Sequence, residues 1–172
     1  MSKSKIKSFV LVGIAIILIF SLCACKKDSA GGSSDSGGGP AESVGEVKEL
    51  VIASGGKISA ICPKDWNDFT DSESSTWEDS LYFSEADAAG DYSKPYFLII
   101  YSDVETTVAG AGEEVTIESA GVTWKGLYDS NYKSFNITTV IDGGASITLM
   151  SRGMDKDNNI FKAVLASVEI TK

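Results

Sequence analysis

From residue 47 onwards the sequence predicts an α+β domain, a mostly antiparallel β-sheet with one or two helices packed on it. Three observations predict this class. Short apolar or alternating segments recur between turns rich in Gly, Asn and Asp, as in strands joined by hairpins. Residues 96–101 form a continuous aromatic and β-branched run, which indicates a central strand. Apolar residues at helical spacing occur near the C-terminus.

The domain is expected to open with a β-hairpin. Residues 47–53 and 57–62 are apolar-rich and are separated by Ser54, Gly55 and Gly56. Pro63 should end the second strand, because proline cannot donate to a strand ladder. Trp66 and Phe69 then follow at helical spacing, so a short helical turn is expected there.

The stretch from residue 65 to residue 91 is unusually acidic, with nine acidic residues and no basic one. It contains a short candidate strand at residues 81–84. The strong strand at residues 96–101 follows Pro95, and residues 109–112 break the chain again.

Three strands of a meander are expected next, at residues 122–128, 132–141 and 145–151. The last two are joined by Asp-Gly-Gly, whose residues tolerate the positive φ of a tight hairpin turn. In the middle strand one face carries four alternating residues. These are Phe135, Ile137, Thr139 and Ile141.

A helix of about two turns, feeding a last strand at residues 168–171, should close the domain. Its predicted apolar face consists of Ile160, Phe161, Val164, Leu165 and Val168. The preceding loop, residues 155–159, has oxygen side chains at alternating positions, like the start of an EF-hand loop. The calcium pattern then fails, since Ile160 replaces the required glycine and Ala166 the bidentate glutamate. We expect this loop to cap the helix and to bind no metal.

Composition excludes several function classes. The 172 residues include 15 Lys+Arg, 24 Asp+Glu and no His. The acidic balance argues against nucleic acid as a partner, since phosphate binding requires clustered cations. The absence of His excludes Ser-His-Asp and Cys-His nucleophile schemes. There is no glycine-rich phosphate loop, so we expect no cofactor.

The N-terminus has the order of a secretory signal: Lys3, Lys5 and Lys7, an apolar run at residues 9–20, then small residues. The run is short for a membrane-spanning helix, which needs about 20 residues. The segment Leu22-Cys23-Ala24-Cys25 resembles the lipobox of bacterial lipoproteins. The resemblance implies a signal peptide at residues 1–24, cleavage after Ala24 and diacylglycerol on the Cys25 thiol. It therefore implies a lipid-anchored protein of the cell membrane, facing outside the cytoplasm.

Residues 25–46 are expected to be the lipidated Cys25 and a flexible Gly/Ser linker, followed by a single domain at residues 47–172. Without residues 1–24 the chain loses three Lys and no acid, so its charge is 12 − 24 = −12. This charge opposes docking on anionic lipid, and the lipid on Cys25 should hold the protein to the membrane. Cys62 is the one other cysteine left, and we expect it to be a buried small hydrophobe.

Both ends of the domain resemble the Mog1/PsbP-like family. Pro63 and Trp66 follow an early strand, as in that family's proline–tryptophan turn. Near the C-terminus Phe161 precedes Leu165-Ala-Ser-Val168 and Ile170, like the family's closing helix. The resemblance implies a fold only, because the family shares no catalytic site.

Two functions remain open. Nine of the sixteen aromatic residues lie between residues 66 and 101, either as core or as a platform for sugars or peptides. Trp77, among Ser, Thr and acids, is the best ligand-binding candidate. We favour a non-catalytic binding or accessory module of the bacterial cell envelope, with a cell-wall, peptide or protein partner. The alternative is a carboxylate-dependent hydrolase acting on cell-wall or extracellular glycans. Its candidate pairs are Asp68 with Asp71, Glu78 with Asp79, and Glu113 with Glu114.

Overall fold

The computed structural model describes residues 44–70, 79–141 and 143–171. All of these described residues belong to one compact unit. Cys25, the predicted signal peptide and most of the predicted linker lie outside the described residues, and so does Trp77.

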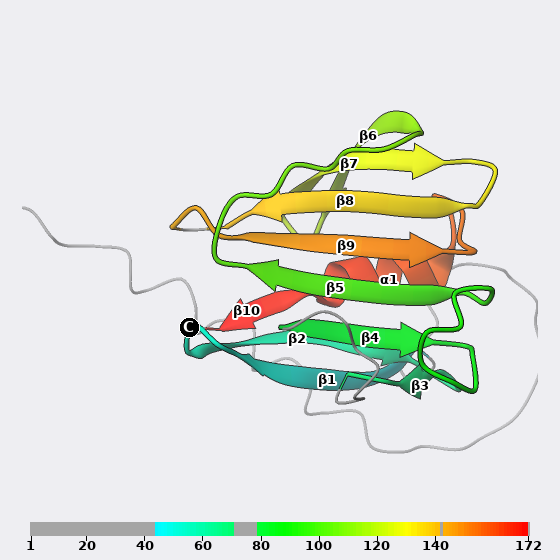
Figure 1. Ribbon diagram of the computed structural model, residues 1–172, viewed down its shortest axis with the longest axis horizontal. Coiled ribbons are helices and arrows are strands. Elements are labelled where there is room, and N and C mark those ends of the chain that lie inside the picture. Colours follow the sequence, from blue (N-terminus) through cyan, green and yellow to red (C-terminus); the bar gives the residue numbers. More distant parts are fainter. Residues whose placement is uncertain (1–43, 71–78, 142, 172) are drawn as a thin grey trace, which may run out of the picture. The chain divides into compact units, whose positions relative to one another are not determined.

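The described chain forms two antiparallel sheets and one helix (Figure 1). The smaller sheet has the order β1-β2-β10, and the larger has the order β3-β4-β5-β9-β8-β7-β6. The smaller sheet consists of β1 (Gly45–Ile52), β2 (Gly56–Pro63) and β10 (Glu169–Thr171). The larger sheet consists of β3 (Asn67–Asp68), β4 (Ser80–Ser84), β5 (Tyr96–Ser102), β6 (Glu113–Ser119), β7 (Val122–Asp129), β8 (Ser134–Val140) and β9 (Ser146–Arg152).

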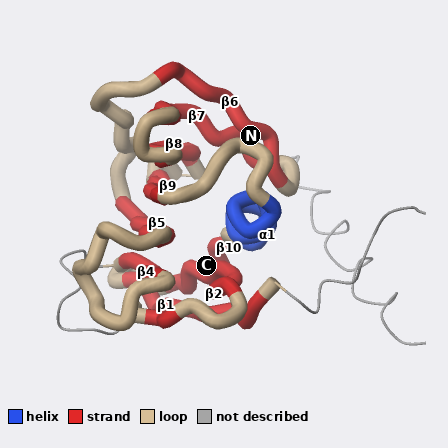
Figure 2. Tube along the Cα trace, turned by 90° about the vertical axis from the view of Figure 1, so that its right-hand side faces the viewer, coloured by secondary structure: helices blue, strands red, loops and turns tan. Residues whose placement is uncertain are grey.

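The seven-stranded sheet has an apolar inner face, because alternate residues of each strand point to the same side. The register aligns Phe97 of β5 with Ser151 of β9, and Ser151 with Phe135 of β8. The helix α1 (Asn159–Ser167) lies against this inner face, and Figure 2 shows it end-on beside β8 and β9. Phe161 of the helix stacks on Phe135 with 4.1 Å between ring centroids and 14° between ring planes.

The core lies between the inner face of the large sheet, the helix and β2. It buries aromatic and aliphatic side chains from β2, β4, β5, β7, β8, β9 and α1. The largest fully buried side chains are Trp124, Phe83, Phe97, Phe135, Phe161, Ile58, Leu81, Ile99, Ile137, Leu149 and Val164.

Both ends of α1 are fixed by side-chain hydrogen bonds. At the N-terminus the Asn158 side chain accepts from the Phe161 N–H at 3.0 Å, as an N-cap does. At the C-terminus the Ser167 hydroxyl accepts from the Ile61 N–H of β2 at 2.9 Å and donates to the Val164 carbonyl at 2.7 Å. Since β10 pairs with residues 57–59 of β2, Ser167 supplies the acceptor next along the same edge.

Most of the predicted elements are confirmed. The first hairpin, the strand at residues 81–84, the interior position of residues 96–101 and the three-strand meander all occur. The two-turn helix feeding a last strand is also correct. The fold is thus sheet-dominated and mostly antiparallel, with a single short helix among the described residues.

Three expectations were wrong or incomplete. The helical turn at Trp66–Phe69 does not form: Asn67–Asp68 is the short strand β3 paired with β4, and Trp66 stacks on Phe97 at 5.4 Å. The sequence pattern missed β6, an edge strand whose exposed positions carry Glu and Thr. The hairpin β1–β2 also pairs with β10 in a separate sheet instead of extending the large one.

Among the residues that the structure describes, no helix is long and apolar enough to span a membrane. The helix α1 has nine residues, less than half of the length that a spanning helix needs.

Replacing Ser167 with Ala should destabilise the domain by about 1–2 kcal/mol, because the partly buried Ile61 N–H then loses its acceptor. The measurement is the free energy of unfolding from urea denaturation. The control is Ser130→Ala at an exposed turn position, which should change it by less than about 0.5 kcal/mol. Equal stability of the two variants would show that Ser167 does not join the helix to β2.

Candidate functional site

A cluster of tyrosines lies on the outer face of the large sheet, the face opposite α1. Directly paired residues share a face, so Tyr96 of β5 and Arg152 of β9 lie side by side there. The Tyr96 ring is 5.3 Å from Tyr92 and 6.3 Å from Tyr82, in edge-on contacts that aromatic pairs favour. Tyr82 is buried among Phe69, Tyr92 and Tyr96, whereas Tyr92 is 42% exposed.

Arg152 is the single arginine of the chain and lies at the edge of this cluster. Its guanidinium carbon is 4.9 Å from the centre of the Tyr132 ring, and the Tyr132 side chain is 58% exposed. No carboxylate of the described residues forms an ion pair with Arg152. Its donors therefore remain available to an external anion. We call these five residues the tyrosine–arginine surface: Tyr82, Tyr92, Tyr96, Tyr132 and Arg152.

The backbone holds Arg152 and Tyr132 in register. The Gly153 N–H donates to the Tyr132 carbonyl at 3.4 Å, and the Met154 N–H donates to the Lys133 carbonyl at 2.9 Å. Gly153 has a φ of +82°, and a Cβ there would lie 2.9 Å from the Pro95 ring. A glycine is therefore required where the segment after β9 passes the entrance to β5.

Two tyrosines of this surface, Tyr82 and Tyr96, have raised pKa values and are therefore neutral phenols at physiological pH. Burial raises the pKa of Tyr96, and the nearby Arg152 offsets part of that increase. Burial likewise raises the pKa of Tyr82, whose hydroxyl accepts from the Gly90 N–H at 3.4 Å. The surface thus combines uncharged aromatic faces with one cation, on a chain whose net charge is −9.

A groove of about 850 Å³ lies on the same outer face, beneath the connection from β5 to β6. Figure 1 shows this connection, residues 103–112, running from β5 to β6 past β9, β8 and β7, the strands that lie between them in the sheet. Thr106 fixes it: its hydroxyl lies 2.9 Å from the Ser146 hydroxyl and 3.1 Å from the Thr148 hydroxyl. The lining mixes threonine hydroxyls, aliphatic side chains, Lys125 and two carboxylates.

The carboxylate pairs proposed from the sequence do not converge where the structure describes them. Glu113 and Glu114 are neighbours on β6 and point to opposite faces. Glu113 is paired with Lys156, whereas Glu114 lines the groove together with Glu105. Asp71 and Glu78, the partners proposed for Asp68 and Asp79, lie outside the described residues.

Two of those acids have local structural roles. Asp68 accepts from the backbone N–H and the hydroxyl of Thr70, at 3.0 and 2.6 Å. Asp79 accepts from the Ala53 N–H at 3.0 Å and so connects β1 to the start of β4. Each carboxylate thus stabilises a turn or a connection between elements.

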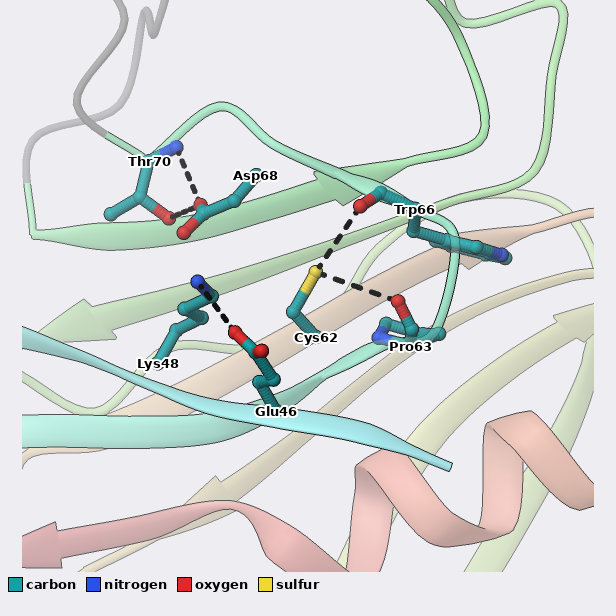
Figure 3. A network of polar contacts seen from close by, with 7 residues as sticks. All are labelled: Glu46, Lys48, Cys62, Pro63, Trp66, Asp68 and Thr70. Carbon is teal, nitrogen blue, oxygen red and sulfur yellow. Dashed lines mark hydrogen bonds and ion pairs between the residues drawn. The ribbon is translucent and has the colours of Figure 1, made fainter. Parts of the chain in front are cut away.

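Cys62 lies at the end of β2 beside the turn from Pro63 to Trp66 (Figure 3). Its sulfur is 3.8 Å from the carbonyl oxygens of Pro63 and Trp66, and the residue is buried. Burial first, and then the negative charge of Asp68, raises the pKa of the Cys62 thiol to about 11. The prediction that Cys62 is buried is confirmed.

The loop before α1 caps the helix through Asn158, as expected from its sequence. Asp155 forms an ion pair with Lys133 at 2.7 Å and accepts from the Tyr128 hydroxyl at 3.0 Å. Asp157 is 3.4 Å from Lys162. Within residues 44–70, 79–141 and 143–171, no group of three or more Cys, Asp or Glu side chains is placed to hold a metal ion.

Sequence reasoning missed Arg152 and Tyr132 as site residues. They are 20 positions apart, and the pairing of β8 with β9 brings them together. A signal was available in the sequence, since a single arginine stands out in an acidic chain. Its aromatic neighbours could not be named without the strand register.

No protein-family model, curated protein or solved structure matches the chain. The resemblances to the lipobox and to the Mog1/PsbP-like family therefore stay predictions from the sequence.

Cys62 should react slowly with iodoacetamide in the folded protein. At about pH 7.5, a thiol pKa of about 11 leaves about 100-fold less thiolate than the ordinary value of 9.0. Mass spectrometry of the peptide 58–64 would follow alkylation, and the control is the same chain in guanidinium. Equal rates in the two conditions would contradict a buried Cys62.

The raised pKa of the Cys62 thiol also determines how the free energy of unfolding changes with pH. Because folding raises the pKa, the contribution of this thiol is present below pH 9 and is lost as the pH rises towards 11. The free energy of unfolding of the wild type should therefore fall more steeply over that range than that of Cys62→Ala.

Proposed function

We propose that the chain is a membrane-anchored lipoprotein exposed outside the cytoplasm, and that its domain is a non-catalytic binding or accessory module of the bacterial cell envelope. The observation that carries the proposal is the sequence Leu22-Cys23-Ala24-Cys25 after a charged and apolar leader. Two acyl chains on Cys25 would give a stable anchor. The Gly/Ser-rich stretch before β1 would let the domain reach ligands beyond the lipid head groups.

The tyrosine–arginine surface supports binding of carboxylate-bearing material of the cell wall. Aromatic faces such as Tyr92 and Tyr132 stack on sugar rings or on peptide side chains. Arg152 offers a planar fork of N–H donors that matches a carboxylate in two parallel hydrogen bonds. An acidic domain would otherwise repel such a ligand, so a cation without a carboxylate partner, here Arg152 beside exposed aromatic rings, should favour binding at this surface.

One observation favours the alternative, a hydrolase of glycans: Glu105 and Glu114 both line the groove beneath residues 103–112. Glycosidases use two carboxylates across a cleft. Both glutamates are exposed, however, whereas a catalytic acid usually lies in an apolar, poorly hydrated pocket. We therefore rank hydrolysis second to binding.

Cys25→Ala should abolish lipidation and leave the protein uncleaved or released from the membrane. Incorporation of labelled palmitate in a bacterial host, followed by membrane fractionation, measures both effects. Cys23→Ala is the matched control and should keep the label and the membrane fraction. The lipoprotein proposal fails if Cys25→Ala is labelled and fractionates like the wild type.

Arg152→Ala should weaken binding of the protein to purified peptidoglycan by about tenfold, since it removes a charge-assisted hydrogen bond. Tyr92→Ala should weaken it about threefold or more through lost stacking. Co-sedimentation with insoluble peptidoglycan measures the affinities.

Lys156→Ala is the control, because Lys156 also lies 4.9 Å from a tyrosine ring but is already paired with Glu113. Its affinity should equal that of the wild type. If the wild type does not bind peptidoglycan, the proposal of a cell-wall ligand is wrong. If the protein releases soluble sugar from the peptidoglycan, the hydrolase is favoured instead.

A further inference from the structure

Arg152 lies between aromatic rings on both of its sides. On one side its guanidinium carbon is 4.9 Å from the centre of the Tyr132 ring. On the other side it is the direct cross-strand neighbour of Tyr96, whose ring centre is 5.3 Å from that of Tyr92. Tyr132 and Tyr92 are both exposed. The tyrosine–arginine surface is therefore a row in which one cation has an exposed aromatic ring beyond it in each direction.

The order of the strands fixes this row. Arg152 ends β9, which lies between β5 and β8 in the large sheet. Tyr96 begins β5, whereas Tyr132 precedes β8 and its carbonyl accepts the Gly153 N–H. Adjacent strands are about 4.8 Å apart. The step from Arg152 to either neighbouring strand is thus comparable to the length of one sugar ring.

The N–H donors of Arg152 are not used by the rest of the domain. The half-buried Arg152 side chain forms neither a hydrogen bond nor an ion pair with the residues that the structure describes. A guanidinium binds a carboxylate through two parallel N–H···O bonds, which fixes the orientation of the bound group. A carboxylate bound here would have one chemical neighbour beside Tyr132 and the other beside Tyr96 and Tyr92.

The aromatic rings determine which groups can flank that carboxylate. The face of an aromatic ring carries partial negative charge, so it attracts the C–H groups of a neutral ring and repels a second carboxylate. The net charge of −9 acts in the same direction on any further acid. The ligand should therefore carry one carboxylate between two uncharged groups.

We propose that this surface binds the middle of a linear glycan, at a carboxylate-bearing sugar that has an uncharged sugar on each side. The carboxylate pairs with Arg152, and the two flanking rings stack on Tyr132 and Tyr92. A peptide chain end has a neighbour on one side of its carboxylate only and would leave one exposed tyrosine unused. The proposal names the ligand class of the binding module proposed above and rests on that function.

The test measures binding of three hexasaccharides to the full-length chain in nanodiscs of zwitterionic lipid, with empty nanodiscs as the blank. The hyaluronan fragment alternates glucuronate with N-acetylglucosamine, the chitin fragment is uncharged, and the oligogalacturonate carries a carboxylate on every ring. Isothermal titration calorimetry gives the affinities. The hyaluronan fragment should bind about tenfold or more tightly than either of the other two.

Variants test where the carboxylate lies within the ligand. Arg152→Ala should reduce the affinity for the hyaluronan fragment to that for the chitin fragment, and Arg152→Lys should restore only part of it, because an ammonium lacks the fork. Tyr132→Ala and Tyr92→Ala should each weaken binding about threefold. A loss in only one of these two variants would show that the ligand ends at Arg152, and would overturn the proposal.

Two measurements keep the variants interpretable. Tyr132 and Tyr92 are exposed, so their variants should fold, and near-ultraviolet circular dichroism verifies this. Lys156→Ala is the matched control and should bind like the wild type, because Lys156 also lies 4.9 Å from a tyrosine ring but is paired with Glu113.

Comparison with peptidoglycan separates this proposal from the proposed function. Removal of the stem peptides by an amidase exposes carboxylates between uncharged rings and should strengthen binding. If intact peptidoglycan binds through Arg152 but no hexasaccharide does, the glycan proposal is wrong and the binding module stands. Binding of the hyaluronan fragment without binding of the stripped peptidoglycan would support the glycan class and place its source outside the wall.

Three other results would overturn the proposal. They are equal affinities for the hyaluronan and chitin fragments, tighter binding of the oligogalacturonate, and tighter binding of the peptide Gly-Gly-Glu-Gly-Gly than of the hyaluronan fragment.

Discussion

The structure depends on how the apolar inner face of the seven-stranded sheet is covered. A sheet with one apolar face must bury that face against another layer. Here the helix α1 does so through Phe161, which stacks on Phe135, while β2 covers the neighbouring part. The Ser167 hydroxyl joins these two covers by accepting from the Ile61 N–H. The outer face does not pack against α1 or β2, so it can present polar and aromatic side chains to solvent.

The two faces therefore offer two kinds of chemistry. On the outer face, Tyr92, Tyr132 and Arg152 combine flat apolar surface with a cation that has no carboxylate partner among the described residues. On the inner face, the short helix leaves a cavity whose lining is mostly aliphatic and carries no charge. The first suits polar, charged polymers in water, and the second excludes charged groups.

In the described part of the chain, burial explains why the Cys62 thiol is neutral, and hydrogen bonds explain the positions of three aspartates. The Cys62 thiol is held neutral by burial beside the turn that leads to Trp66. Asp68, Asp79 and Asp155 each accept hydrogen bonds that fix a turn or join two elements. An acidic sequence can thus supply many carboxylates without bringing two together in a dry cleft.

The sequence by itself determined most of the local structure: the first hairpin, the central strand at residues 96–101, the meander and the C-terminal helix with its last strand. Alternation and helical spacing are local signals, so they can be read without knowing the fold. It could not reveal that β10 pairs with β2, that residues 67–68 extend along β4, or that β6 completes the sheet edge. The approach of Arg152 to Tyr132, and the aliphatic cavity of the inner face, were likewise decided by tertiary structure. Both depend on strand register and on the length of the covering helix, which are set by contacts between distant segments.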